Sequence, residues 1–343
     1  MEIRMKDRRF SKSAIHGITG IASLLLCSLF AVADSAPKPP GKLVDLGGRK
    51  LHVYCTGSGG PTVVVENGLG DFSFDWILVQ THVSRFARIC TYDRAGYAWS
   101  DLGPMPRTFA QINLELRDAL AKLGEKGPFV LVGHSFGGPV VRNFAVIYPE
   151  HTAGMVLVDA ATEGLRVGIG KKKTIRLGED AQNREIPLPH EEMKSSDQPP
   201  APPPEAVQAP TQLDPLYNRL PPQQQKLQLW AQSQWQIEYA EGSQREWSSE
   251  YFAKLLANPQ SGNLGAIPLI VLTRAIGDYE DMDVPATQLE QERKDGQAHL
   301  IHLSTNSRQI ILHCGHNMEL EAPDDVSLAI LKVVEAVRHH QKV

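Results

Sequence analysis

The chain has 343 residues, and 35 lysines and arginines against 39 aspartates and glutamates give it a formal charge of −4. With 42% hydrophobic and 22% charged residues, it has the composition of a folded domain rather than of a fibrous or disordered chain. The acidic balance argues against a nucleic-acid partner, which needs a basic surface, and four cysteines are too few for a disulfide-built scaffold.

Residues 1–33 have the layout of a secretory signal peptide. A basic start is followed by an apolar stretch, and Ala31-Val32-Ala33 gives the small-x-small pattern that signal peptidase accepts. The alternative is a retained membrane anchor over 14–33, which would be the one part of the chain in contact with a membrane. We therefore expect an exported protein, periplasmic or extracellular, in which the proline-rich residues 34–41 form a linker.

Strands and helices alternate along residues 42–160 and again along 264–343. The expected strands are short apolar runs at 51–55, 61–66, 87–92, 129–132, 154–158, 268–272 and 307–313. The expected helices run from a capping box at Thr108 and Gln111 to Gly124, over 140–148, and from Asp324 or Asp325 towards the end. This repetition predicts an α/β fold with a doubly wound, mostly parallel sheet.

Between residues 161 and 263 the alternation stops, which predicts an insertion that acts as a lid. Eleven of the 24 prolines lie between 187 and 222, so we expect 184–222 to be a flexible segment. Farther on, aromatic residues indicate helices. Trp230 and Trp235 are expected in one helical stretch, and Trp247, Tyr251 and Leu255 recur every four residues in another. An insertion at this point of such a sheet usually covers the ligand crevice.

The chemistry is concentrated in Gly133-His-Ser-Phe-Gly137, which lies directly between an expected strand and an expected helix. A serine on such a sharp turn is strained and exposed above the sheet, and the two glycines remove side chains that would collide with the turn. The helix that follows directs its amino end at any negative charge that develops there. Ser135 is therefore the candidate nucleophile.

A serine hydroxyl needs a base, and His316 is the candidate because it follows the last expected strand. For the acid that orients His316, the residues leave two alternatives, Asp159 and Asp278, each placed after a strand and between Ser135 and His316 in the chain. The H-x-x-H spacing at His313 and His316 does not predict a metal site, because residues i and i+3 of a strand point to opposite faces.

An oxyanion hole needs two backbone N–H donors. One is expected from Phe136, the residue after the nucleophile, and the other from Leu69 in the loop Asn67-Gly-Leu-Gly70. Gly68 would let the backbone of this loop approach a substrate closely.

Together these motifs resemble the α/β-hydrolase superfamily. Residues 92–101 are similar to the family's D-R-x-G-x-G-x-S-D segment, and residues 315–323 are similar to its G-H…P ending. The resemblance implies the fold, a serine nucleophile, a histidine base, a variable lid and no cofactor. The loop after Leu272 departs from the family's Gly-x-x-Asp turn, and since some relatives carry the acid where Asp159 stands, the resemblance favours Asp159. It also places the strands of Cys55 and Cys90 side by side, which allows a disulfide.

The sequence thus predicts a serine hydrolase that cleaves an ester-like bond of a small apolar substrate through an acyl-enzyme. The apolar character is inferred from the tryptophans and leucines of the lid. The competing hypothesis is a protein that binds small molecules on the same scaffold with little or no turnover. The sequence leaves the identity of the substrate and the oligomeric state open.

Overall fold

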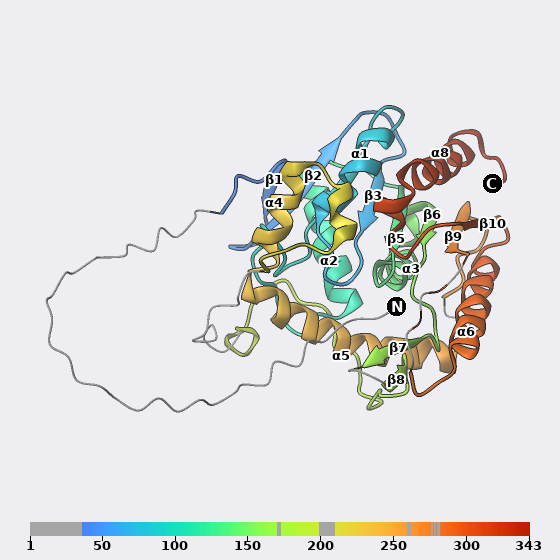
Figure 1. Ribbon diagram of the computed structural model, residues 1–343. Helices are drawn as coiled ribbons and strands as arrows, with labels where there is room; N and C mark the ends of the chain where they lie inside the picture. The colour runs from blue at the N-terminus through green and yellow to red at the C-terminus, as the bar shows by residue number, and fades with distance from the viewer. Residues whose placement is uncertain are drawn as a thin grey trace, which may run out of the picture.

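The computed structural model describes residues 36–169, 173–198, 210–258, 262–275, 277, 279 and 282–343. Within this part of the chain, a sheet of eight strands is ordered β1-β2-β4-β3-β5-β6-β9-β10 (Figure 1). The strands are β1 (Lys42–Asp45), β2 (Lys50–Thr56), β3 (Val63–Glu66), β4 (Ile89–Tyr92), β5 (Phe129–His134), β6 (Thr152–Val158), β9 (Leu269–Arg274) and β10 (Ser307–Leu312).

The sheet is parallel from β4 to β10, and β1 and β2 add an antiparallel edge. Strands β3, β4, β5 and β9 are buried along their whole length, as their continuous apolar runs predict. Because parallel strands all end at the same edge, the loops after β3, β5, β6 and β9 lie together. This edge carries the residues singled out in the sequence.

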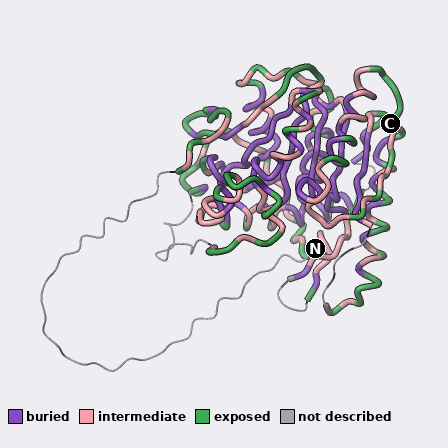
Figure 2. The backbone as a smooth tube through the Cα atoms, turned by 45° about the horizontal axis from the view of Figure 1, so that its top comes forward, coloured by how far each residue is buried: buried purple, intermediate pink, exposed green. Residues whose placement is uncertain are grey.

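Helices cover both faces of the sheet. Residues of α2 (Phe109–Lys122) and α3 (Gly137–Ile147) share one hydrophobic core with one face of the strands. Residues of α1 (Ile77–Val83) and α8 (Pro323–His339) share a second core with the opposite face. Figure 2 shows the buried strands in the centre and the exposed segments around them. The predicted doubly wound α/β fold is confirmed.

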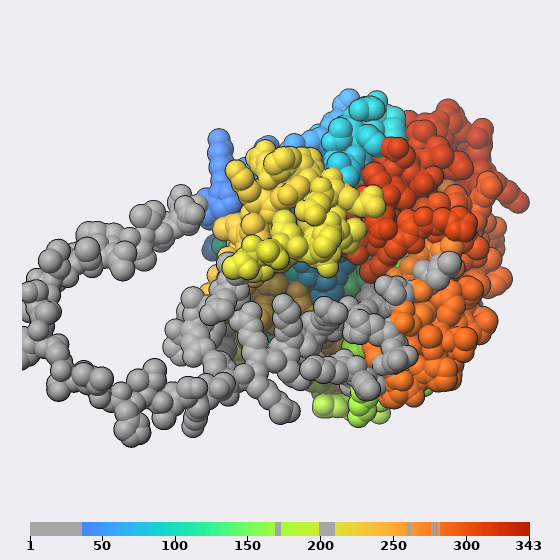
Figure 3. All heavy atoms as spheres, viewed as in Figure 1, coloured from blue at the N-terminus to red at the C-terminus, as the bar shows by residue number. Residues whose placement is uncertain are grey.

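An insertion separates β6 from β9. It contains the antiparallel hairpin β7 (Arg166–Ile169) and β8 (Lys173–Arg176), the short helices η3 (Ser195–Asp197) and η4 (Pro215–Arg219), and the helices α4 (Pro222–Ala231) and α5 (Trp235–Ala257). Segment η4 packs against α7 (Met318–Glu321), and α4 packs against η1 (Ser73–Trp76). In Figure 3 the yellow residues of this region lie against the cyan and red surfaces.

The sequence did not anticipate every element. Trp230 lies at the end of α4 and Trp235 begins α5, so the single helical stretch expected for them is wrong. Helix α4 ends at Ala231, and a turn at Gln232 and Ser233 separates the two helices. Elements without a strong apolar period, most of them short, were also missed: β1, α1, η2 (Pro149–His151), α6 (Ala286–His299), η6 (Leu300–Leu303) and the β7–β8 hairpin.

The described part of the 34–41 segment packs on the domain. The carbonyl oxygen of Pro37 accepts a hydrogen bond from Trp99 Nε1 at 2.6 Å, and that of Pro40 accepts one from His52 Nε2 at 2.5 Å. The signal-peptide prediction for residues 1–33 lies outside the described residues. None of the helices in the described ranges has the length and apolar character needed to cross a bilayer.

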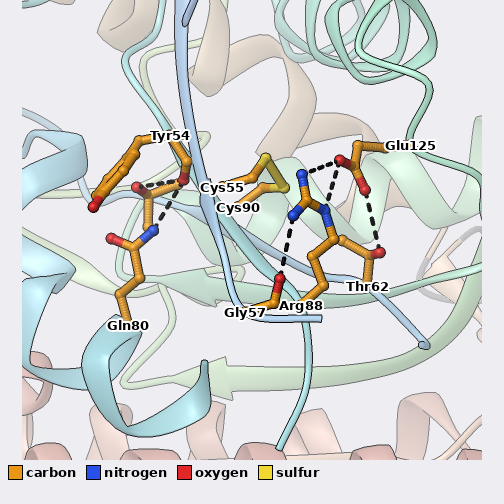
Figure 4. Close-up of a disulfide and its surroundings, with 9 residues drawn as sticks. Tyr54, Cys55, Gly57, Thr62, Gln80, Arg88, Cys90 and Glu125 are labelled. Carbon is orange, nitrogen blue, oxygen red and sulfur yellow. Dashed lines mark hydrogen bonds and ion pairs between the residues drawn. A yellow bond between two sulfur atoms is a disulfide. The ribbon is translucent and has the colours of Figure 1, made fainter. Parts of the chain in front are cut away.

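Cys55 and Cys90 form a disulfide between β2 and β4. The two residues are directly opposite each other in the sheet, and their sulfur atoms are 2.05 Å apart (Figure 4). Beside the bridge, Arg88 binds the Glu125 carboxylate at 2.7 Å. Cys314 is a free thiol in the described part of the chain.

The disulfide predicts a measurable contribution to stability. It joins residues 35 positions apart, and chain entropy for a loop of that size gives about 3–4 kcal/mol. We expect the double variant Cys55→Ala/Cys90→Ala to lose about that much free energy of unfolding in urea. Thiol titration of unfolded, unreduced protein lacking residues 1–33 should find one thiol, Cys314. Three reactive thiols would contradict the bridge.

Candidate active site

Ser135 occupies the sharp turn between β5 and α3. Its backbone φ is 49°, in the left-handed region that residues other than glycine rarely adopt. Hydrogen bonds on both sides hold this conformation: the Ser135 N–H donates to Val158 O at 3.1 Å, and the Ser135 carbonyl accepts from Ala161 N at 2.9 Å. The strained turn is therefore tied to the end of β6, the neighbouring strand.

The glycines around this turn are required by close packing. A Cβ on Gly133 would lie 2.6 Å from the Gly137 carbonyl oxygen, and one on Gly137 would lie 2.7 Å from the Asn67 carbonyl oxygen. A Cβ on Gly68 would collide with Asp71 and lie 2.9 Å from His134 Nδ1. A side chain at Gly133 would push α3 away from the end of β5, and one at Gly137 or Gly68 would push apart the turn and the loop after β3.

Three side chains that are distant in the sequence form one hydrogen-bonded chain. Ser135 Oγ lies 3.0 Å from His316 Nε2, and His316 Nδ1 lies 2.6 Å from Asp159 Oδ2. Asp159 follows β6 directly, with a φ of 38°, and its N–H donates to Leu272 O on β9. The alternative acid, Asp278, lies outside the described residues. This is the arrangement of nucleophile, base and orienting acid that acyl transfer requires.

Electrostatics favours an ionised acid and a neutral base. Burial raises the pKa of Asp159, but the hydrogen bond and charge of His316 and the nearby Arg274 and Arg293 outweigh it and lower that pKa to about 2. Burial also lowers the pKa of His316, and His134 and Arg274 act in the same direction against the opposing effect of Asp159. His316 is therefore neutral at pH 7, and its Nε2 can accept a proton.

His134, next to the nucleophile, supports the loop that carries His316. Its Nδ1–H donates to Asp71 Oδ2 at 3.1 Å, and its Nε2–H donates to the His316 carbonyl at 3.0 Å. Burial lowers the pKa of His134, but Glu319 and Asp71 outweigh it and raise the pKa to about 9. A buried, protonated imidazole thus fixes the His316 backbone, a role that the sequence analysis missed.

The two residues expected to supply the oxyanion donors meet in one apolar cluster. Phe136 immediately precedes α3, and Leu69 packs against the cluster of Phe109, Ile112, Phe136 and Val140. Arg94 binds the Leu69 loop, with its guanidinium donating to the carbonyls of Asn67 at 2.8 Å and Gly68 at 2.6 Å. These bonds fix the direction of two carbonyls of the loop.

Arg94 is only 1% exposed, and a second set of contacts holds it in place. It pairs with Glu66 at 2.8 Å, and its guanidinium lies 4.7 Å from the Tyr97 ring centre. Burial disfavours the charge of Arg94, but Tyr97 and Glu66 outweigh that effect and raise its pKa. Arg94 lies within residues 92–101, and no role was expected for it from the sequence. The available signal was a charged residue two positions after the buried strand β4.

The aromatic residues of the insertion are used in packing. Trp230 lies 5.1 Å from Trp99 between ring centres, Tyr251 lies 4.6 Å from Phe109, and the Arg184 guanidinium lies over Trp247. The first two contacts attach α4 and α5 to the sheet domain, and the third lies within the insertion. Together they explain the aromatic pattern without a ligand.

Comparison with known proteins establishes the family. The model of the alpha/beta hydrolase family matches residues 63–329, so this chain belongs to that family. The resemblance inferred from the sequence motifs is thereby confirmed, and hydrolase is the class of enzyme that fold and family support.

Individual relatives are distant. The chain is 36% identical over 129 residues to the probable transporter efuK of Hormonema carpetanum, a match that covers 35% of this chain and 18% of that protein. It is 32% identical over 124 residues to the uncharacterized protein YbdG of Bacillus subtilis, covering 36% of this chain and 38% of that protein. The chain thus matches well under half the length of these relatives.

Solved structures share the fold over most of the chain. A thermophilic esterase from Thermogutta terrifontis aligns with a TM-score of 0.57 at 18% identity, over 86% of this chain and 97% of that one. The enol-lactonase from Burkholderia xenovorans LB400 aligns with a TM-score of 0.55 at 16% identity, over 84% of this chain and 98% of that one. At these identities the structures show a common fold alone.

The contacts of Arg94 predict a large effect of its removal. Arg94→Met removes the counter-ion of the buried Glu66 carboxylate and a charged donor to the carbonyls of Asn67 and Gly68. The free energy of unfolding should therefore fall by about 3–5 kcal/mol in urea titrations. As a control, Arg117→Met breaks a pair with Asp118 whose side chains are 33% and 26% exposed, and it should cost less than about 1 kcal/mol. Equal losses in the two variants would contradict this assignment.

Proposed function

We propose that the protein is a serine hydrolase that cleaves an ester-like bond through an acyl-enzyme. The observation that carries the proposal is the chain of two hydrogen bonds, 3.0 Å from Ser135 Oγ to His316 Nε2 and 2.6 Å from His316 Nδ1 to Asp159. A serine hydroxyl becomes a useful nucleophile only when a base removes its proton as it attacks, and this arrangement supplies that base.

In the first half of the reaction, Ser135 Oγ attacks the substrate carbonyl while its proton passes to His316 Nε2. Asp159 stabilises the imidazolium and keeps its Nδ1–H in place. The backbone N–H groups of Phe136 and Leu69 donate to the oxyanion, and each such donor contributes about 3–4 kcal/mol to transition-state stabilisation. His316 then gives the proton to the leaving oxygen, and an acyl-Ser135 ester remains.

In the second half, water takes the place of the leaving group. His316 removes a proton from the water, the hydroxide attacks the acyl carbon, and Ser135 leaves with the proton that His316 returns. The site needs no cofactor for this cycle, because nucleophile, base and oxyanion donors all belong to the chain.

The surroundings of the loop Asn67–Gly70, which carries Leu69, support an apolar group on the acyl side of the substrate. Leu69 and Tyr251 pack against the Phe136 cluster, so the N–H donors are bordered by aliphatic and aromatic side chains. A small acyl or aryl group would remove this surface from water. Trp230 and Trp247 of the insertion do not supply this apolar surface, because they pack against Trp99 and Arg184.

Export is part of the proposal. A disulfide persists in an oxidising compartment, and Cys55–Cys90 fits the periplasm or the cell exterior better than the cytosol. The signal-like residues 1–33 point to the same compartment.

A fluorophosphonate probe tests the proposed function directly, because it reacts covalently with an activated serine. We expect stoichiometric labelling of the wild type and of Ser84→Ala, a control at the end of α1, and no labelling of Ser135→Ala. His316→Gln should label at least a hundredfold more slowly. Folded wild-type protein that resists the probe would overturn the proposal and favour the non-catalytic binding protein.

A further inference from the structure

A small cavity opens beside Ser135 on the side of the acid. Its volume is about 20 Å³, which is the room that one water molecule or one carboxylate oxygen needs. Ser135, His316 and Asp159 line one part of it, and the three arginines Arg166, Arg274 and Arg293 line another. The cavity includes none of the residues of the apolar cluster around Phe136.

Two of these arginines have carboxylate partners. Arg166 Nε lies 3.2 Å from Glu292, and Arg293 donates to Glu290 at 2.8 and 3.0 Å. Their charges are largely compensated by these neighbours.

Arg274 is different. Its side chain is 6% exposed, yet its guanidinium makes no hydrogen bond within the described residues. Among the described residues, Arg274 forms one ion pair, in which its Nε lies 3.4 Å from Asp159 Oδ2 without hydrogen-bond geometry. That same oxygen accepts the short bond from His316 Nδ1.

A guanidinium carries five N–H donors, and burial without acceptors is costly. The structure therefore holds a buried cation whose donors face a cavity shared with the nucleophile. An acceptor that enters this cavity would satisfy Arg274 and would lie next to the reacting bond.

Resting on the function proposed above, we propose that this cavity is a subsite for an anionic group of the substrate, with one carboxylate-like oxygen bound by Arg274. Arg166 and Arg293 add positive charge around the same oxygen. The substrate class is then an ester that carries a negative charge near the scissile bond, while its apolar part faces Leu69 and Phe136.

The bound anion would also assist the chemistry. Arg274 disfavours a second positive charge on His316, which must become an imidazolium as Ser135 attacks. A negative group on Arg274 offsets that repulsion in the transition state. An anionic substrate should therefore gain in turnover as well as in binding.

The simpler reading is that Arg274 serves only as a counter-ion of Asp159. The two readings differ in what they predict. If Arg274 is only a counter-ion, its removal acts through Asp159 and His316 and lowers kcat/KM for every ester equally. If it belongs to an anion subsite, its removal lowers kcat/KM mainly for anionic esters.

Two matched pairs of esters separate these readings. For the acyl side, the pair is the mono-p-nitrophenyl ester of adipic acid and p-nitrophenyl hexanoate. For the alcohol side, it is 3-acetoxybenzoate and 3-acetoxybenzamide. In at least one pair we expect the wild type to prefer the anionic member by tenfold or more in kcat/KM, as a charge-assisted contact of about 1.5–3 kcal/mol implies.

Arg274→Gln should abolish the preference for the anionic ester and should lower kcat/KM for the neutral esters by a smaller factor. Arg274→Lys should retain part of the preference. Arg308→Gln is the matched control. It removes an arginine from an exposed position of β10 and should leave the preference unchanged. Thermal unfolding of each variant shows whether it is folded.

The inference is overturned if the wild type shows no preference in either pair of esters, or if Arg274→Gln lowers kcat/KM for all four esters by the same factor. Should the wild type hydrolyse none of the esters, the proposed function fails separately. Calorimetry with Ser135→Ala then decides the subsite: tighter binding of 3-acetoxybenzoate than of the amide, lost in Ser135→Ala/Arg274→Gln, supports it, and equal binding rules it out.

Discussion

The hydrogen bond between His316 and Asp159 is the constraint on which the site depends. An imidazole at the end of a loop can rotate and can carry its proton on either nitrogen. The carboxylate at the end of β6, 2.6 Å away, fixes both the ring and the tautomer, so that Nε2 faces Ser135 as an acceptor. Because β5 and β6 are adjacent parallel strands, nucleophile and acid emerge from the same edge of the sheet.

Buried charges outside the triad keep this arrangement rigid. Arg94 holds the loop of Leu69, the proposed oxyanion donor, and protonated His134 holds the backbone of His316. Each of these cations is compensated, Arg94 by Glu66 and His134 by Asp71 and Glu319. Arg274 departs from this pattern, since the one carboxylate that it approaches in the described part of the chain is already bound by His316. A buried charge without its own acceptor is more consistent with recognition than with stability.

The parts of the fold with strong local signals could be predicted from the sequence. Continuous β-branched runs predict the buried strands. Ser135 is flanked by Gly133 and Gly137, a spacing that few turns other than a strand-to-helix nucleophile turn require. His316 followed from its place after the last strand. The residues alone did not decide between Asp159 and Asp278, because both follow strands and a loop can carry its acid to the same point in space.

What sequence reasoning missed depends on contacts between distant segments. Nothing local to Arg94 or His134 says that its side chain will meet the loops after β3 and β10. The break between α4 and α5 likewise lies in a polar stretch, where the helical period of the tryptophans gives no warning of a turn. The arginines beside Ser135 come from β7, β9 and α6, three segments that only the folded chain brings together.

The most direct test of the account is the loss of kcat/KM for p-nitrophenyl butyrate in Asp159→Asn compared with Asp278→Asn. If Asp159 orients His316, Asp159→Asn leaves the wrong tautomer and should lose about three to four orders of magnitude, while Asp278→Asn stays within a fewfold of the wild type. The reverse result, with activity lost in Asp278→Asn and retained in Asp159→Asn, would contradict the account.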